Sequence, residues 1–161
     1  MILFADFQCV YCAQLVPVLA QVLAARPHDV RLVYRHLPLP PLHPQAAGAA
    51  LGAVCAEQQG RFWEMFDHLF ANPSQLEPDA LRATAVSLGA NGPAYDACVT
   101  NRATQQRIDR DVAAAADIGL NGTPVLFVNG RLLRGMQPLP SLLAIVDEER
   151  SRQSAMTPTA R

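Results

Sequence analysis

The 161-residue sequence predicts an α/β fold, in which a mixed sheet of about four strands is interrupted by a block of helices. Residues 1–37 predict a strand, a helix and a strand, an order that gives a parallel pair with a right-handed crossover. Residues 44–118 show helical apolar spacing and no strand pattern. Residues 124–134 hold two short runs around Asn129-Gly130, which is the strongest two-residue hairpin signal.

The N-terminal part alternates strand and helix signals. Residues 1–7 are apolar and predict the first strand, and from about Cys9 to Ala25 apolar residues recur at helical spacing. Pro17 lies inside that helix and removes an N–H donor, so we expect a kink there. Residues 30–37 have the β-branched, alternating character of a strand, which the proline-rich run 38–44 ends.

The inserted block predicts five helices. They are expected at about residues 45–59, around the aromatic face of Phe62, Trp63, Phe66, Leu69 and Phe70, after each of the first-turn prolines Pro78 and Pro93, and at about 103–118, where Gly119 supplies the C-cap. The helical spacing of the aromatic residues favours the core of the insert and the lining of a groove, with some of them edging the site as an apolar surface.

The C-terminal part returns to the sheet. Its expected elements are strands at 124–128 and 131–134 and a helix at 139–150, followed by a polar, non-periodic stretch at 151–161 that predicts a flexible tail. We therefore expect one domain over residues 1–150. Its sheet-forming parts cover about 1–43 and 119–150, and its helical insert covers about 44–118.

Composition excludes several classes of protein. The sequence is 50% hydrophobic and 17% charged, a balance that favours a packed core over disorder. The formal net charge of −1 argues against nucleic-acid binding through bulk basic charge. No apolar stretch approaches the roughly 20 residues of a spanning helix, and no secretory signal pattern is visible. The sequence as written thus predicts a cytoplasmic protein that is not integral to a membrane.

Cys9 and Cys12 stand at the expected junction of a strand and a helix. Because they are three residues apart, both sulfurs fall on one helix face, close enough to bond. The first lies beside unpaired N–H groups and the positive end of the helix dipole, so its thiolate is stabilised and it is the nucleophile. The second is the resolving thiol of a disulfide exchange. Two structural thiols or half of a zinc site are the alternatives, but zinc needs four ligands and no second Cys pair or paired His motif exists.

Gly122-Thr123-Pro124 precedes the third expected strand. A proline at a strand start cannot donate to the ladder. A cis Thr123–Pro124 bond would leave the backbone of Thr123 free to pair with a substrate peptide. An ordinary trans turn proline is the alternative.

Four segments, in this order, make the chain resemble the DsbA-like thioredoxin-fold family. They are 4–12 (FADFQCVYC), 34–39 (YRHLPL) followed by His43-Pro44, 55–65 (CAEQQGRFWEM) and 122–130 (GTPVLFVNG). The likeness runs from about residue 2 to 149. It implies a thioredoxin fold with an inserted all-helical subdomain, and dithiol–disulfide oxidoreductase activity that needs no metal or organic cofactor.

The resemblance also assigns roles and partners. It implies attack by Cys9, resolution by Cys12 and a cis proline at Pro124. Substrate contacts are expected at Thr123, Pro124, Val10 and Tyr11. The implied partners are cysteine-containing protein substrates and a membrane redox partner that reoxidises the site. Nucleic acid is not among them.

Three features depart from the family pattern. Val10 stands where the family has proline after the first cysteine, so the redox potential cannot be carried over. Leu3 stands where many relatives hold a buried acid that takes the proton of the resolving thiol, and Asp6 is expected to point to another face than Leu3. The family begins with a further strand, so the sheet as written is one edge strand short.

The remaining Cys and His residues receive less specific interpretations. The resemblance allows a structural disulfide between Cys55 and Cys98 in an oxidising compartment, and two buried free thiols are the alternative. It gives His36 and His43 no catalytic role, and we expect both to be surface or capping histidines.

The sequence therefore favours a thiol–disulfide oxidoreductase acting on protein cysteines, with an oxidase of exported proteins as the first hypothesis. A reductase or isomerase using the same residues is one alternative. A non-catalytic peptide-binding or regulatory module is the other, since related domains occur fused to membrane transporters. The family resemblance favours the periplasm or cell envelope, in contrast to the cytoplasm that the sequence as written predicts.

Overall fold

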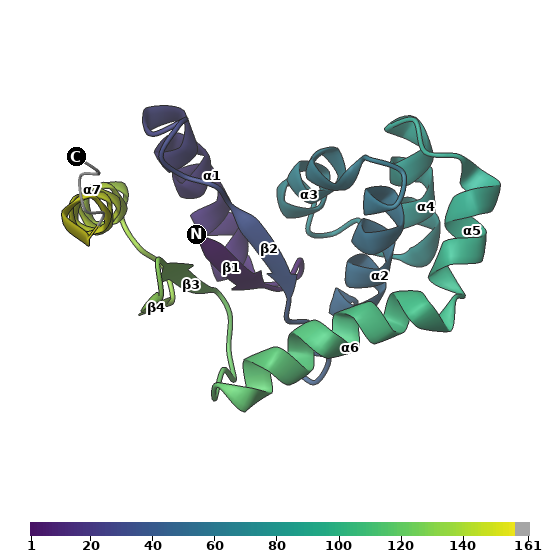
Figure 1. Ribbon diagram of the computed structural model, residues 1–161. Coiled ribbons are helices and arrows are strands. Elements are labelled where there is room, and N and C mark those ends of the chain that lie inside the picture. The colour runs from purple at the N-terminus through teal and green to yellow at the C-terminus, as the bar shows by residue number, and fades with distance from the viewer. Residues whose placement is uncertain (157–161) are drawn as a thin grey trace.

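Four short strands form one mixed sheet in the order β2-β1-β3-β4 (Figure 1). In the computed structural model, which describes residues 1–156, β1 (Ile2–Ala5) is parallel to β2 (Val33–His36) and antiparallel to β3 (Val125–Val128). β4 (Arg131–Arg134) pairs antiparallel with β3. The hairpin residues Asn129 and Gly130 have φ values of 49° and 88°, the positive values that a two-residue turn requires. The predicted mixed four-stranded sheet is confirmed.

Within the described residues, seven helices accompany the sheet. They are α1 (Val10–Ala25), α2 (Ala46–Glu57), α3 (Phe62–Ala71), α4 (Pro78–Ser87), α5 (Gly92–Val99), α6 (Arg102–Asp117) and α7 (Leu139–Met156). Figure 1 shows α2 to α5 gathered beside the sheet, with α6 running back from them toward β3. The helical insertion between β2 and β3 therefore agrees with the predicted architecture.

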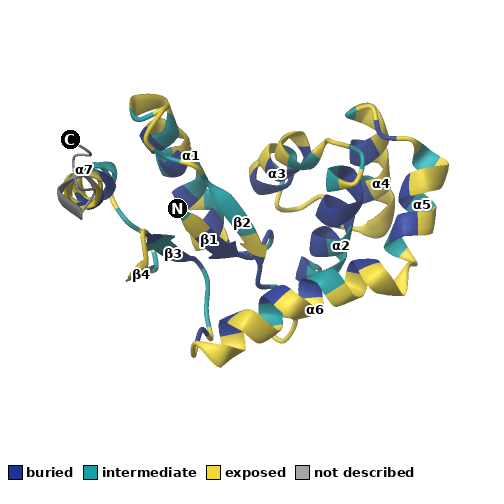
Figure 2. Ribbon diagram, in the orientation of Figure 1, coloured by how far each residue is buried: buried dark blue, intermediate teal, exposed yellow. Residues whose placement is uncertain are grey.

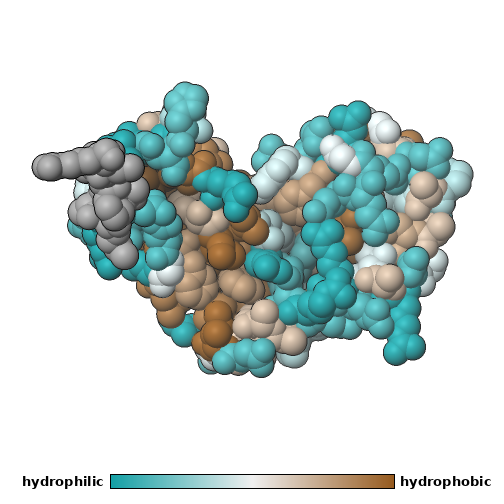
Figure 3. All heavy atoms as spheres, viewed as in Figure 1, coloured by the Kyte–Doolittle hydropathy of each residue, from teal (hydrophilic) through white to brown (hydrophobic). Residues whose placement is uncertain are grey.

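The pleat of β1 divides the core between the two faces of the sheet. Leu3 and Ala5 lie in one buried cluster with Leu142 of α7, whereas Phe4 packs on the other face against Ala115 of α6. Figure 2 shows the inward sides of these elements buried and their outward sides exposed. On the face seen in Figure 3, hydrophobic residues gather over the sheet between α7 and the insert.

The last helix is longer than the sequence predicts. α7 continues to Met156 rather than ending at 150, so residues 151–156 are helical. The flexible tail expected at 151–161 stays a prediction, and its part at 157–161 lies outside the described residues. The segment 151–156 contains no glycine or proline to end a helix. Arg152 also forms an ion pair with Glu149, three residues earlier, at 3.0 Å.

The second strand is shorter than the sequence predicts. Its ladder begins where the Val33 N–H donates to the Met1 carbonyl at 2.9 Å, so β2 starts at residue 33 rather than at 30. Val30 instead donates its N–H to the carbonyl of Arg26, in the turn that ends α1. The kink expected at Pro17 does not interrupt α1.

His36 is buried, so the prediction of a surface or capping histidine is wrong. Only 2% of the residue is exposed, and its ring meets that of Tyr34 at a centroid distance of 5.0 Å. Phe7 and Phe62 also lie against it. Its Nδ1 is buried without a hydrogen-bond partner. The reason is the period of the strand, which points Tyr34 and His36 to the same side, toward the aromatic face of α3.

Acid is expected to destabilise the fold through His36. Burial lowers the pKa of His36 from about 6.5 to about 4, so the unfolded chain takes up a proton at higher pH than the folded chain. The stabilisation is fully present above pH 6.5 and is lost as the pH falls toward 4, by about 3 kcal/mol in all. Urea unfolding at pH 7 and pH 4.5 measures the loss. His36→Phe should make it smaller, and an equal loss in both proteins would contradict the assignment.

Trp63 lies at the edge of the aromatic face of α3, where it takes the groove-lining position that the sequence analysis allows for these residues. Phe66 and Phe70 are buried as expected, but Trp63 is 45% exposed. Its ring packs edge-on against Phe62 and lines a hollow of about 350 Å³ between β2 and the insert, together with Tyr34. It therefore lines a groove and is not part of the core, because residue 63 lies at one edge of the apolar stripe that Met65, Phe66, Leu69 and Phe70 form on α3.

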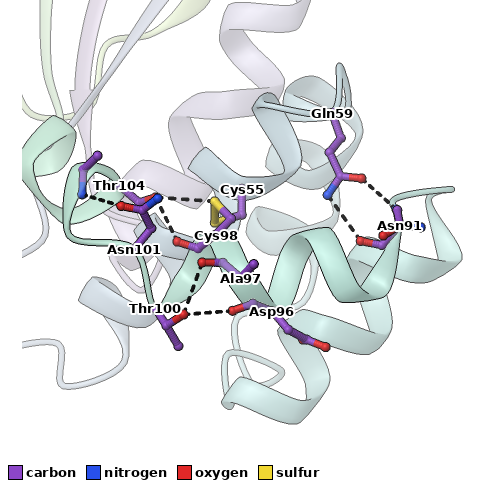
Figure 4. Close-up of a disulfide and its surroundings, with 10 residues drawn as sticks. Cys55, Gln59, Asn91, Asp96, Ala97, Cys98, Thr100, Asn101 and Thr104 are labelled. Carbon is purple, nitrogen blue, oxygen red and sulfur yellow. Dashed lines mark hydrogen bonds between the residues drawn. A yellow bond between two sulfur atoms is a disulfide. The ribbon is translucent and has the colours of Figure 1, made fainter.

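A disulfide joins two helices of the insert. Cys55 of α2 and Cys98 of α5 are bonded, with an S–S distance of 2.02 Å (Figure 4). The Thr104 hydroxyl at the start of α6 donates to the carbonyl of Cys98 at 2.8 Å, so α6 is fixed to the same point. Of the two interpretations that the sequence leaves open, the structure contains the disulfide.

Candidate active site

The turn between β1 and α1 sets the position of Cys9. The Cys9 N–H donates to the carbonyl of Asp6 at 3.1 Å, and Cys9 is the extended N-cap residue of α1, with φ −77° and ψ 117°. Its Sγ accepts a hydrogen bond from the Cys12 N–H at 3.4 Å. The sulfur thus takes the place of the side-chain oxygen of a Ser or Asp cap, and it uses an N–H group that the helix leaves unpaired.

These contacts stabilise the charged form of Cys9. The Cys12 side chain has the largest effect, and the Thr123 side chain and the N–H groups of Cys12 and Tyr11 add to it. Together they lower the pKa of the Cys9 thiol to about 5, although burial acts in the opposite direction. Such a thiol is almost wholly thiolate at pH 7, which is the form that attacks a disulfide.

Cys12 has the opposite environment. It is 1% exposed against 4% for Cys9, and both are free thiols in this structure. Burial, followed by the neighbouring Cys9, raises the pKa of the Cys12 thiol well above its ordinary value. Cys12 therefore keeps its proton while Cys9 is charged. The two sulfurs differ in the way that attack and resolution require.

The segment before β3 passes close to Cys9. The Thr123–Pro124 peptide bond is cis, and the Thr123 carbonyl oxygen lies 3.5 Å from Cys9 Sγ. A thiol can donate a hydrogen bond to that carbonyl, but a thiolate cannot. The Thr123 hydroxyl oxygen is buried and has no hydrogen-bond partner in the structure, and the Thr123 side chain helps to lower the pKa of Cys9.

Val10 and Tyr11 open α1 and lie between the two cysteines. Each is 59% exposed, which is unusual for residues of this size and places apolar surface beside Cys9. Leu42, in the loop between β2 and α2, is 72% exposed, and it belongs to no sequence motif that would indicate a site. The substrate contacts expected of Val10, Tyr11, Thr123 and Pro124 stay predictions.

Asp6 and His43 form a pair that sequence reasoning missed. The Asp6 carboxylate is buried, and its Oδ2 lies 2.8 Å from Nδ1 of His43, whose side chain is 23% exposed. His43 is therefore not the surface or capping histidine that was predicted. The signal was the parallel pairing of β1 with β2, because parallel strands end at the same edge of a sheet and bring the residues after them together.

Leu3 is completely buried in the same cluster as Cys12, so the position at which many relatives carry an acid is apolar here.

None of the helices among residues 1–156 is long and apolar enough to cross a membrane. In the part of the chain that the structure describes, no group of three or more His, Cys, Asp or Glu side chains is placed to hold a metal ion.

A mixed four-stranded sheet with a helical insertion and a Cys-x-x-Cys pair at a helix start define the thioredoxin-fold class of thiol–disulfide oxidoreductases. The chain belongs to the DSBA-like thioredoxin domain family, which matches residues 1–147. The resemblance stated from the sequence motifs is thereby confirmed.

Solved structures support the same fold. A thioredoxin-like oxidoreductase from Silicibacter pomeroyi DSS-3 is 27% identical with a TM-score of 0.84, over 93% of this chain and 85% of that one. DsbA2 of Pseudomonas aeruginosa is 26% identical with a TM-score of 0.72, over 92% and 87%. The thiol-disulfide exchange protein α-DsbA2 of Wolbachia pipientis, at 18% identity and a TM-score of 0.82 over 92% and 80%, shares the fold.

The curated relatives are longer proteins. The Na(+)/H(+) antiporter NhaA 3 of Salinispora tropica is 40% identical over 143 residues, which are 89% of this chain and 22% of the antiporter. The antiporter NhaA of Herminiimonas arsenicoxydans is 34% identical over 147 residues, 91% of this chain and 23% of that protein. The chain thus spans less than a quarter of the length of these relatives.

Proposed function

We propose that this domain exchanges disulfides with cysteine-containing proteins and acts as an oxidase. The observation that carries the proposal is the contrast between Cys9, whose pKa is lowered to about 5, and Cys12, which is more deeply buried and protonated. A stabilised thiolate lowers the free energy of the reduced pair. Reduction of the disulfide is then more favourable, so the pair is a strong oxidant.

The reaction starts from the Cys9–Cys12 disulfide. A substrate thiolate attacks Cys9 Sγ, so a mixed disulfide forms, the Cys9–Cys12 bond breaks, and Cys12 leaves and takes up a proton. A second substrate thiolate then attacks the substrate sulfur of the mixed disulfide and releases Cys9 as a thiolate. The substrate gains a disulfide, and the domain gains two electrons. A redox partner, which we place in the membrane, would remove those electrons.

The reduction potential of the Cys9–Cys12 pair tests the direction. We expect a value nearer to about −120 mV than to about −270 mV, because a thiolate stabilised to a pKa near 5 favours the reduced form. The measurement is alkylation and mass spectrometry after equilibration in glutathione buffers of graded ratio. A value near −270 mV would favour a reductase, and a pair that does not cycle would exclude the enzyme.

A second candidate function rests on the relatives. Because the curated matches are antiporters of which this chain covers less than a quarter, our alternative proposal is a regulatory or peptide-binding domain of a transporter polypeptide. That role needs no turnover, so multiple turnovers by Cys9 and Cys12 on a disulfide substrate would favour the enzyme.

The Cys55–Cys98 disulfide supports an oxidising compartment, such as the cell envelope, for both candidate functions.

A further inference from the structure

The buried Asp6 carboxylate ties the active-site turn to the loop that follows β2. Its Oδ1 accepts the Gln8 N–H at 2.8 Å, and its Oδ2 accepts the Leu39 N–H at 2.9 Å and lies 2.8 Å from His43 Nδ1. A carboxylate only accepts hydrogen bonds, so His43 carries its hydrogen on Nδ1. Three donors on one carboxylate that is shielded from water make a strong, directional link.

A second link lies beside the first. The Gln45 N–H donates to Oε1 of Gln8 at 2.8 Å, and the Gln8 amide donates to Oε1 of Gln45 at 3.4 Å. Residues 6–8 are thus joined to residues 39–45 at both ends of the turn. Gln45 also bonds to Glu77, the N-cap of α4, so the links reach into the insert.

The position of this turn determines which N–H groups face Cys9 Sγ. The same Asp6 accepts the Cys9 N–H through its carbonyl, which fixes where α1 begins. The Cys12 N–H reaches Cys9 Sγ at 3.4 Å, a contact that a small rotation of the turn would lengthen or break. The geometry around Cys9 therefore depends on groups that lie more than 30 residues away in the sequence.

We propose that Asp6 and His43 are positioning residues of this site: their buried pair holds the turn from Asp6 to Cys9 against the loop after β2, so that the first N–H groups of α1 face Cys9 Sγ. The inference rests on the proposed function, in which Cys9 Sγ carries the mixed disulfide and is then released as a thiolate. The Gln8 N–H on Oδ1 is a local contact that the turn makes by itself. The contacts on Oδ2 are the ones that need the folded domain. Without His43, that oxygen keeps a buried, poorly satisfied lone pair and the carboxylate moves with its turn.

The test compares His43→Leu with His43→Asn, whose side-chain N–H₂ can occupy the place of Nδ1. His28→Leu is the matched control, since His28 is exposed and lies beyond the opposite end of α1 from Cys9. Two quantities are measured on the whole chain: the pH midpoint of Cys9 alkylation and the equilibrium constant with glutathione. For His43→Leu we expect the midpoint to rise by about one pH unit and the equilibrium to shift about fivefold toward the disulfide. The Asn variant and the control should stay within about twofold of the unchanged chain.

Each outcome decides the proposal. A folded His43→Leu variant with an unchanged midpoint and an unchanged equilibrium would overturn it, as would equal shifts in the Leu and Asn variants. If His43→Leu does not fold, Asp6→Asn gives the same readout, because its amide keeps an acceptor for Gln8 and presents N–H₂ to the loop. If the unchanged chain does not cycle in glutathione, the proposed function fails, and the alkylation midpoint still tests the positioning.

Discussion

Replacement of Cys9 by Ser is expected to lower the rate of disulfide exchange by more than about 10³-fold. A hydroxyl is not ionised near pH 7, whereas the Cys9 thiol, with a pKa near 5, is almost wholly thiolate. The Ser side chain keeps the cap position at the start of α1, so the fold should be unchanged. The measurement is thiol–disulfide exchange with a synthetic peptide that carries one disulfide, with reduced glutathione as the source of electrons. Circular dichroism establishes that the variant is folded.

Cys12→Ser separates attack from resolution. Cys9 still attacks in this variant, but the buried hydroxyl cannot displace the substrate, so a mixed disulfide through Cys9 should accumulate within one turnover. Mass spectrometry of the acid-quenched protein detects the adduct, and the double variant at Cys9 and Cys12 is the control that should form none. If the adduct forms at Cys12 in the Cys9→Ser protein instead, the roles of the two sulfurs are reversed and the proposed mechanism is wrong.

The order of the elements and the Cys9–Cys12 pair could be predicted because their signals are local. A Cys-x-x-Cys pair between a strand and a helix, and Asn129-Gly130 between two apolar runs, depend on residues a few positions apart. The same local pattern predicts too long a strand for β2, because the start of β2 depends on where its partner strand begins. It also predicts too short a helix for α7, because residues 151–156 contain no glycine or proline that would end the helix.

The environments of the two histidines could not be predicted for a related reason. The burial of His36 depends on which helix covers that face of the sheet, and the pairing of His43 depends on Asp6, 37 residues earlier. Periodicity gives the face of a strand or helix that is apolar, but not what packs on it. The site therefore contains a well-predicted centre, Cys9 and Cys12, with a surrounding set of contacts that only the tertiary structure provides.

Removal of the Cys55–Cys98 disulfide is expected to lower the free energy of unfolding by about 4 kcal/mol. The bond closes a segment with a sequence separation of 43, and the loss of chain entropy in the unfolded state grows with that length. For a chain of this size the melting temperature should fall by roughly 10 °C. Urea and thermal unfolding of Cys55→Ala/Cys98→Ala measure the effect. The exchange activity of Cys9 and Cys12 should persist below the new transition, because the bond lies in the insert.

Reduction supplies the control for that experiment. Dithiothreitol should lower the stability of the unchanged chain toward that of the double variant. The double variant, measured with and without dithiothreitol, gives the separate effect of reducing the Cys9–Cys12 pair. A double variant within about 1 kcal/mol of the unchanged chain would contradict a stabilising role. If the expected loss is found, the domain reaches its full stability only where Cys55 and Cys98 stay oxidised. An oxidising compartment then suits both the oxidase reaction and the stability of the insert. In a reducing compartment, the same active site would lie in a domain whose free energy of unfolding is lower by the contribution of the disulfide.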